Sequence, residues 1–181
     1  MPFRVEHKEI EDVLVIAPKS FSDERGYFKE TFKESDFRSV GIKHNFKQDN
    51  ESYSKKGVLR GLHYQLDPVS QGKLVRVVQG SVFDVAVDLR RDSVTYGKWV
   101  SETLSAENQL ILWIPPGFAH GFLATEDSIL VYKATNEYSR PHERGIIWND
   151  THLSIEWPWK SPVVIDRDLE FPSFKEADMN F

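Results

Sequence analysis

The feature that most limits how this chain can fold is a series of short apolar segments separated by turn residues. Between Phe83 and Leu89, apolar residues alternate with Asp84, Ala86 and Asp88, which is the period of a half-buried β-strand. Further strands are expected at residues 13–16, 27–32, 58–64, 73–79, 99–104, 110–114, 121–124 and 128–134. Short strands at regular spacing, with Gly, Pro and Asn between them, predict an all-β sandwich or closed barrel.

Little of the chain is predicted to be helical. The best helix candidate is the segment 33–40, for which Gly41 is a suitable stop. The tail from Trp157 onward contains three prolines, and it is expected to form irregular structure or short helical turns outside the barrel. A length of 181 residues without repeats or linkers suits a single domain spanning residues 1–181.

The composition excludes several classes of function. The net charge is −5 and no basic block is present, so neither a nucleic acid nor a membrane surface is expected as a partner. The absence of cysteine rules out disulfides, thiolate catalysis and cysteine metal ligands. No segment approaches the roughly 20 apolar residues of a membrane span. A cytoplasmic location is therefore expected.

Polar segments at residues 23–30, 48–65 and 114–122 interrupt the strand pattern. The composition of the first favours a charged hairpin. In the second, Arg60 and His63 lie in a strand-like run with two glycines, which allow the backbone to approach another group closely. A single histidine in an apolar strand is more often a satisfied core residue than a catalytic group. Neither His63 nor His120 alone therefore indicates a function.

Taken together, the second and third segments resemble the two motifs of the cupin jelly roll. The third matches Pro-x-Gly-x-x-His at Pro115, Gly117 and His120. Metal-binding cupins have a second histidine two residues after the first and then a glutamate, whereas here Gln65 follows His63 and no glutamate follows at that distance. An amide is a poor partner for imidazoles around a transition metal. We therefore expect a cupin-type double-stranded β-helix with no metal site, which works by acid–base chemistry.

An ordered set of motifs extends this resemblance over nearly the whole chain. The motifs are Asp23-x-Arg25-Gly26-x-Phe28-x-Glu30, Gln48-x-Asn50-x-Ser52, Gly57-Val58-Leu59-Arg60-Gly61-Leu62-His63, Gln71-Gly72-Lys73-Leu74-Val75, Asp84-Val85-Ala86-Val87-Asp88, Gly117-Phe118-Ala119-His120-Gly121-Phe122, Tyr132-Lys133 and Trp148-Asn149-Asp150. Together they resemble the dTDP-4-dehydrorhamnose 3,5-epimerase family. The resemblance implies a homodimer without a cofactor. It also implies conversion of dTDP-4-dehydro-6-deoxy-D-glucose to dTDP-4-dehydro-L-rhamnose, by inversion of the two carbons that flank the C4 ketone.

The resemblance also implies four catalytic roles. His63 matches the base, and an imidazole with histidine's ordinary pKa of about 6.5 is largely neutral near pH 7. Asp168 matches the carboxylate that fixes the tautomer of this histidine, although Ile165 stands where the family commonly has serine. Tyr132 matches the proton donor, which must act from the opposite face of the sugar. Lys73 matches the cation that stabilises negative charge on O4. Without the resemblance, Asp168 would be interpreted as a solvated tail residue and Tyr132 as a barrel tyrosine.

Other residues match the family's contacts with the nucleotide sugar. They are Arg25, Glu30, Gln48, Asn50, Arg60, Lys73, His120, Glu143 and Arg167. Arginine suits a diphosphate because its planar fork bonds two oxygens at once. The family exchanges its first strands between subunits, so Arg25 and Glu30 are expected to serve the partner's site. Arg167 stands at a position that is commonly lysine, and Glu143 lies where family members differ in spacing.

The sequence leaves three alternatives open. A related cupin epimerase that inverts only C3 or only C5 could use the same residues. A non-catalytic cupin that binds sugar nucleotides is expected to lack the base or the donor, whereas this chain has both. A metal-dependent cupin oxygenase would contain stoichiometric iron.

Overall fold

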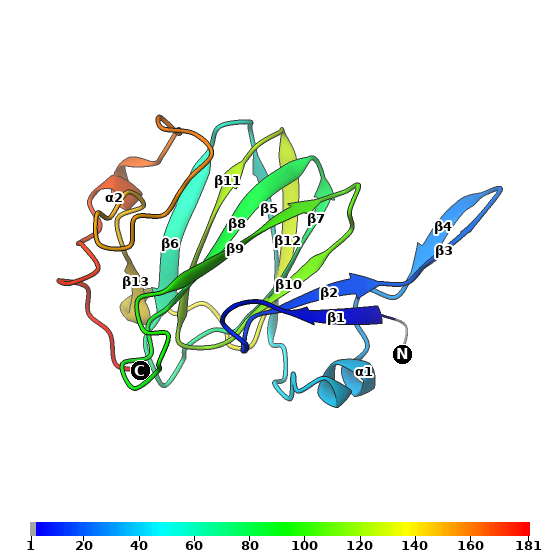
Figure 1. Cartoon of the computed structure of the whole chain (residues 1–181), viewed down its shortest axis with the longest axis horizontal. Helices are drawn as coiled ribbons and strands as arrows, with labels where there is room; N and C mark the ends of the chain where they lie inside the picture. Colours follow the sequence, from blue (N-terminus) through cyan, green and yellow to red (C-terminus); the bar gives the residue numbers. More distant parts are fainter. Residues whose placement is uncertain (1–2) are drawn as a thin grey trace.

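Short β-strands dominate the computed structural model, which describes residues 3–181 (Figure 1). The strands are β1 (Phe3–His7), β2 (Leu14–Pro18), β3 (Ser20–Asp23), β4 (Gly26–Lys29), β5 (Gln48–Ser54), β6 (Leu59–Gln65), β7 (Lys73–Gln79), β8 (Ser81–Asp88), β9 (Trp99–Ser105), β10 (Ile111–Ile114), β11 (Phe118–Ala124), β12 (Ser128–Ala134) and β13 (Glu143–Gly145). The helices are α1 (Glu34–Ser39), the single 3₁₀ turn η1 (Arg140–His142) and α2 (Asp166–Leu169). None of the helices in this part of the chain is long and apolar enough to cross a membrane.

Two antiparallel sheets face each other to form the barrel. The six-stranded sheet has the order β1-β2-β10-β7-β12-β5, and the five-stranded sheet has the order β13-β6-β11-β8-β9. The side chains between the sheets form one buried apolar cluster, to which Val75 of β7 and Phe122 of β11 belong. Burial of this apolar surface is the main contribution to the stability of the fold. The architecture is the mostly β, cupin-type jelly roll that the sequence predicts.

Both outer faces of the barrel are partly covered. Phe37 of α1 packs on the six-stranded sheet, where it joins Leu74 and Ile111 in a second cluster. The C-terminal segment lies on the five-stranded sheet, where Phe174 packs with Val85 in a third cluster. This packing holds the C-terminal segment against the sheet, although the segment contains little regular structure.

The strand β8 corrects one prediction from the sequence. Its alternation of apolar residues with Asp84, Ala86 and Asp88 suggested a half-buried strand. In the structure both faces are covered, because Val85 faces the C-terminal segment and Ala86 faces the barrel interior. Asp84 and Asp88 are fully buried. Asp84 is bonded by His120 of the neighbouring strand β11, and Asp88 is bonded by Arg90 in the turn that follows β8.

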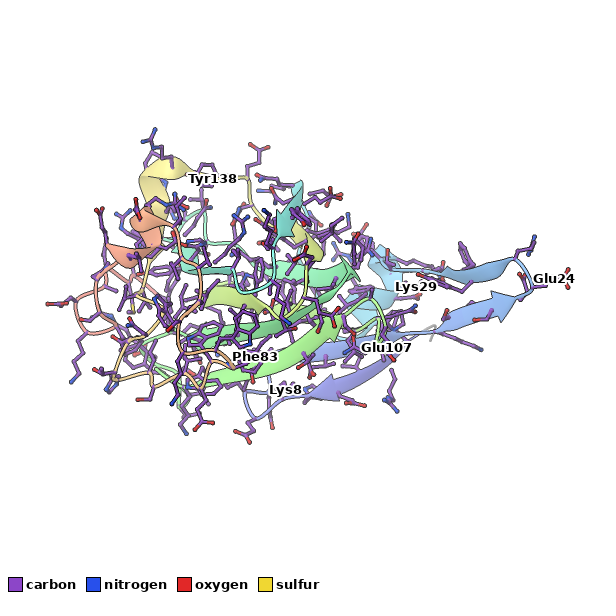
Figure 2. The ribbon with its side chains drawn as sticks, turned by 90° about the horizontal axis from the view of Figure 1, so that it is seen from above. Lys8, Glu24, Lys29, Phe83, Glu107 and Tyr138 are labelled. Carbon is purple, nitrogen blue, oxygen red and sulfur yellow. The ribbon has the colours of Figure 1, made fainter. Side chains whose placement is uncertain are left out.

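The hairpin formed by β3 and β4 projects away from the barrel (Figure 1). Its second strand, β4, ends at Lys29, whereas the sequence predicted a strand over residues 27–32. Three aromatic residues of the hairpin are exposed, with 49% of Phe21, 60% of Tyr27 and 67% of Phe28 accessible. An isolated two-stranded hairpin is marginally stable in water. Figure 2 shows Glu24 at the far end of the hairpin, well away from Tyr138 on the body of the protein.

Candidate active site

Two histidines face the barrel interior from neighbouring strands of the five-stranded sheet. Leu62 and Tyr64 point to the outer cluster, so His63 between them points inward. His63 lies directly opposite His120 of β11 in the strand register. The two strands come unusually close here, because a Cβ atom on Gly61 would lie only 2.6 Å from the Cα of Gly121.

The ring of His63 is held by a buried carboxylate. Nε2 of His63 lies 2.9 Å from Oδ2 of Asp168, which comes from α2 and is only 1% exposed. The same oxygen accepts a hydrogen bond of 3.2 Å from the backbone N–H of Gly61. Burial alone would raise the pKa of Asp168, but its hydrogen bonds and the neighbouring charges lower the pKa below the ordinary value. The carboxylate therefore stays ionised and fixes the ring, while Nδ1 has no hydrogen-bond partner among residues 3–181.

A second histidine–carboxylate pair lies beside the first. Nε2 of His120 lies 2.9 Å from each carboxylate oxygen of Asp84, and both residues are buried. Burial lowers the pKa of His120, and the charge of Asp84 only partly offsets this effect. Electrostatic interactions with Lys73 and with His63 lower it further, so both of these groups lie within electrostatic reach of His120.

Lys73 and Tyr132 come from the opposite sheet. The ammonium group of Lys73 lies 5.9 Å from the centre of the Tyr132 ring. Lys73 is only 8% exposed, and burial lowers its pKa to about 8, although the charges of Asp84 and Glu143 favour the protonated form. Tyr132 packs on the interior cluster, and burial raises its pKa. An amine with this pKa can carry its positive charge near neutral pH and is poorly solvated, as a group that stabilises an oxyanion should be.

The strand β5 places two amides on the same face as Tyr132. Asn50 is opposite Tyr132 in the register, and Gln48 donates a hydrogen bond of 2.8 Å from Nε2 to Oδ1 of Asn50. Nδ2 of Asn50 is buried without a hydrogen-bond partner. A buried donor without an acceptor is costly unless a ligand or a water completes it. Asn50 is therefore suited to receive an acceptor group from a ligand.

Charged residues line the mouth of the barrel beside these amides. Glu143 accepts hydrogen bonds of 2.8 Å from the hydroxyl of Tyr138 and 3.0 Å from Nη1 of Arg167. Arg60 is exposed and donates from Nε to the hydroxyl of Ser54 at 2.9 Å. The structure thus brings together in one chain His63, Asp168, Tyr132, Lys73, Gln48, Asn50, Arg60, His120, Glu143 and Arg167.

Arg25 and Glu30 are not brought to this mouth by their own chain. Arg25 lies at the turn of the projecting hairpin, where it pairs with Asp23 at 2.6 Å. Glu30 follows directly after β4 and is exposed. The hairpin carries both residues away from the barrel of the same chain.

Three residues with a part in the site were missed from the sequence. Asp84 was considered only as part of a half-buried strand and of a family motif, and Tyr138 lies in a loop without any periodic pattern. Gln65 was considered only as a failed metal ligand. Its amide in fact bonds three backbone groups, namely the carbonyls of Val69 and Glu137 and the N–H of Ser139. Gln65 therefore anchors the loop that carries Tyr138. Within residues 3–181, no three His, Asp or Glu side chains are grouped in a way that could hold a metal ion.

Comparison with known proteins identifies relatives over nearly the full length. The family model described as dTDP-4-dehydrorhamnose 3,5-epimerase matches residues 7–176. The enzyme of that name from Shigella flexneri is 56% identical over 172 residues, covering 94% of this chain and 95% of that protein. The crystal structure of the Sulfolobus tokodaii enzyme is 50% identical, covers 98% of each chain and superposes with a TM-score of 0.92. A Legionella pneumophila structure in complex with dTDP-4-keto-L-rhamnose is 42% identical, covers 97% of this chain and 95% of that one, and has a TM-score of 0.94. This chain therefore belongs to the dTDP-4-dehydrorhamnose 3,5-epimerase family of carbohydrate epimerases.

Proposed function

We propose that this protein converts dTDP-4-dehydro-6-deoxy-D-glucose to dTDP-4-dehydro-L-rhamnose by inverting C3 and C5. One observation carries the proposal: the carboxylate-held His63 and the free phenol of Tyr132 come from facing sheets of one barrel. Inversion needs a base on one face of the sugar ring and an acid on the other. The dTDP-4-dehydro sugar in the name of the Shigella flexneri relative suits this chemistry, because its C4 ketone acidifies the hydrogens on both flanking carbons.

His63 is the base in the proposed mechanism. Asp168 accepts the hydrogen bond from Nε2, so the lone pair of Nδ1 is available to take a proton from carbon. The electron pair of the broken C–H bond forms a double bond to C4 of the sugar, and the π electrons of the carbonyl group move onto O4, which gives an enolate. The buried carboxylate then stabilises the imidazolium that has formed.

Lys73 stabilises the enolate oxygen. Its ammonium group is buried, where a charge interacts more strongly than in water. A preorganised donor of this kind contributes about 3–4 kcal/mol to lowering the barrier. Tyr132 then gives its hydroxyl proton to the opposite face of the same carbon, and the electron pair returns from O4. Exchange with solvent restores the phenol and the neutral imidazole before the second carbon reacts.

The nucleotide is bound at the mouth. Arg60 and Arg167 are exposed cations there and suit the diphosphate, while Gln48, Asn50, His120 and Glu143 offer polar contacts to the rest of the ligand. The proposed steps use only side chains of the protein. A cytoplasmic location, which the composition favours, belongs to the same proposal.

A second copy of the chain completes the site in this proposal. The outer strand β5 has a free edge beside Gln48 and Asn50, and free edges accept strands from other chains. The exposed aromatic hairpin of a partner could pair there and deliver Arg25 and Glu30. A hollow of about 390 Å³ on the outer face of the six-stranded sheet also contains the half-buried Arg76. Arg76 has no hydrogen bond or ion pair within residues 3–181, as is expected of an interface residue.

Proton exchange with solvent tests the proposed function. The protein is incubated with dTDP-4-dehydro-6-deoxy-D-glucose in D₂O, and deuterium is located in the product by NMR. Label at both C3 and C5 together with the L-rhamno configuration supports the proposal. Label at one carbon alone would instead establish a single-position epimerase, and binding of the nucleotide sugar without exchange would establish a non-catalytic cupin.

A further inference from the structure

Arg167 is the only cation of α2, and it contacts two carboxylates with different surroundings. Nη1 lies 3.0 Å from Oε2 of Glu143 at the mouth, and Nε lies 3.5 Å from Oδ1 of Asp168. Glu143 and Asp168 are held on β13 and α2, which both contact β6. The guanidinium therefore links the mouth to the residue that holds His63.

The environment of Asp168 makes this link significant. Oδ2 is fully used, because it accepts from both the ring of His63 and the N–H of Gly61. Oδ1 is buried and has no hydrogen-bond donor among residues 3–181. A buried carboxylate oxygen without a donor is costly, and a neighbouring cation is the group that offsets this cost. Arg167 is the cation that lies closest to Oδ1.

We propose that Arg167 is a positioning residue for the base, because it bridges Glu143 to Asp168 and so holds the carboxylate that orients His63. The inference rests on the proposed role of His63. It adds to the expected contact between Arg167 and the diphosphate, and it assigns a second effect to the same side chain. The groups that face the Asp168 carboxylate are His63 and the N–H of Gly61 from β6 and Arg167 from α2, while Glu143 of β13 faces the other end of the guanidinium.

The test compares Arg167→Met with Arg167→Lys. Arg167 is 55% exposed, so both variants are expected to fold, and thermal unfolding monitored by circular dichroism checks this. In Arg167→Met, kcat should fall roughly tenfold, the scale seen when the partner that orients a metal-bound histidine is removed. The acidic limb of the kcat/KM profile should move to higher pH, because the charge of Arg167 is one of the causes that lower the pKa of Asp168. Arg167→Lys keeps the charge and should restore most of kcat and the position of the limb.

Arg144→Met provides the matched control. Arg144 is also a partly exposed arginine in an ion pair, with Asp178 at 3.1 Å, and it donates to the backbone carbonyls of Pro141 and Glu143. Within residues 3–181, no hydrogen bond or ion pair joins Arg144 to His63 or Asp168. Its loss should leave kcat and the pH profile unchanged. A change in KM alone for Arg167→Met would overturn the inference and leave a purely phosphate-binding role. A kcat for Arg167→Lys as low as that for Arg167→Met would also overturn it. If His63→Ala retained turnover, the proposed base would be wrong, which is a separate failure.

Discussion

The ring of His120 donates from Nε2 to Asp84, whose two carboxylate oxygens both lie 2.9 Å from that nitrogen. This pair does not reach the base directly, but its negative charge favours the protonated form of Lys73. In the proposed mechanism, Asp84 therefore supports the cation that stabilises the enolate.

Asp84→Asn should shift the basic limb of the activity profile. In the proposed mechanism Lys73 acts in its protonated form. Because its pKa is about 8, activity in the wild type should fall as the pH rises through about 8. Removal of the Asp84 charge lowers the pKa of Lys73 further, so the basic limb should move to lower pH. The measurement is kcat between pH 6 and pH 10, and an unmoved basic limb would show that Lys73 is not the titrating group.

Lys73→Met should lose activity and gain stability. Lowering the pKa of Lys73 from 10.5 to about 8 corresponds to about 3 kcal/mol in the free energy of unfolding. The folded protein is destabilised by this full amount below pH 8, where Lys73 is protonated in both the folded and the unfolded state. Between pH 8 and pH 10.5 the unfolded state binds more protons, so this cost disappears as the pH rises. Urea unfolding should therefore show the variant to be more stable at pH 7, by up to about 3 kcal/mol, with a smaller difference at pH 10. Equal stability at pH 7 would contradict the predicted burial cost.

Tyr132→Phe should separate proton removal from inversion. The variant keeps His63 and Asp168, so abstraction and return of a proton on the same face should continue. In D₂O the substrate should gain deuterium while product formation slows by about 10²-fold or more. Loss of both exchange and inversion would place Tyr132 in an earlier step than the one proposed.

Mixing two inactive variants should restore activity if the hairpin serves the partner subunit. In a heterodimer of His63→Ala and Arg25→Ala chains, one of the two sites has an intact His63 from one chain and an intact Arg25 from the other. Random reassembly makes half of the dimers mixed, so about a quarter of the wild-type activity should return. Co-refolded chains are assayed against each variant alone. No recovery in a mixture that is shown to contain heterodimers would indicate that Arg25 acts within its own chain.

Gln65→Leu should destabilise the barrel and loosen the loop that carries Tyr138. The substitution leaves two backbone carbonyls and one N–H without their partner, at a cost of about 1–3 kcal/mol for each group that stays buried. Chemical unfolding gives the loss of stability, and hydrogen exchange should report faster opening at residues 137–139. Gln65→Glu is the control, since it keeps an acceptor for Ser139 but not the two donated bonds.

The series of strands was predictable because most of them have an apolar inward face. β5 was not predicted, and its register explains why. The residues that it directs inward are Gln48, Asn50 and Ser52, so the face that an apolar period would reveal is polar. The strand β8 was predicted, but its burial was not. Both of its faces are covered, so the alternation of residue types gave no information about exposure.

The site was predictable only as far as family motifs reach. No local pattern connects Asp168 with His63, because 105 residues separate the two and only the folded barrel brings them together. Asp84 and Tyr138 have the same limitation, since their roles depend on contacts made by the tertiary structure. The placement of Arg25 and Glu30 beyond their own barrel could not follow from periodicity, which describes one chain.

The late position of Asp168 in the chain has a consequence for biosynthesis. Every strand of both sheets precedes it, so a nascent polypeptide can complete its barrel before the carboxylate leaves the ribosome. The imidazole gains its partner only when α2 docks on β6. A protease that clipped the chain ahead of α2 would remove Asp168 and Arg167 together, and the ring of His63 would lose the carboxylate that orients it in the proposed mechanism. Turnover should therefore report whether the last part of the chain has docked on the barrel.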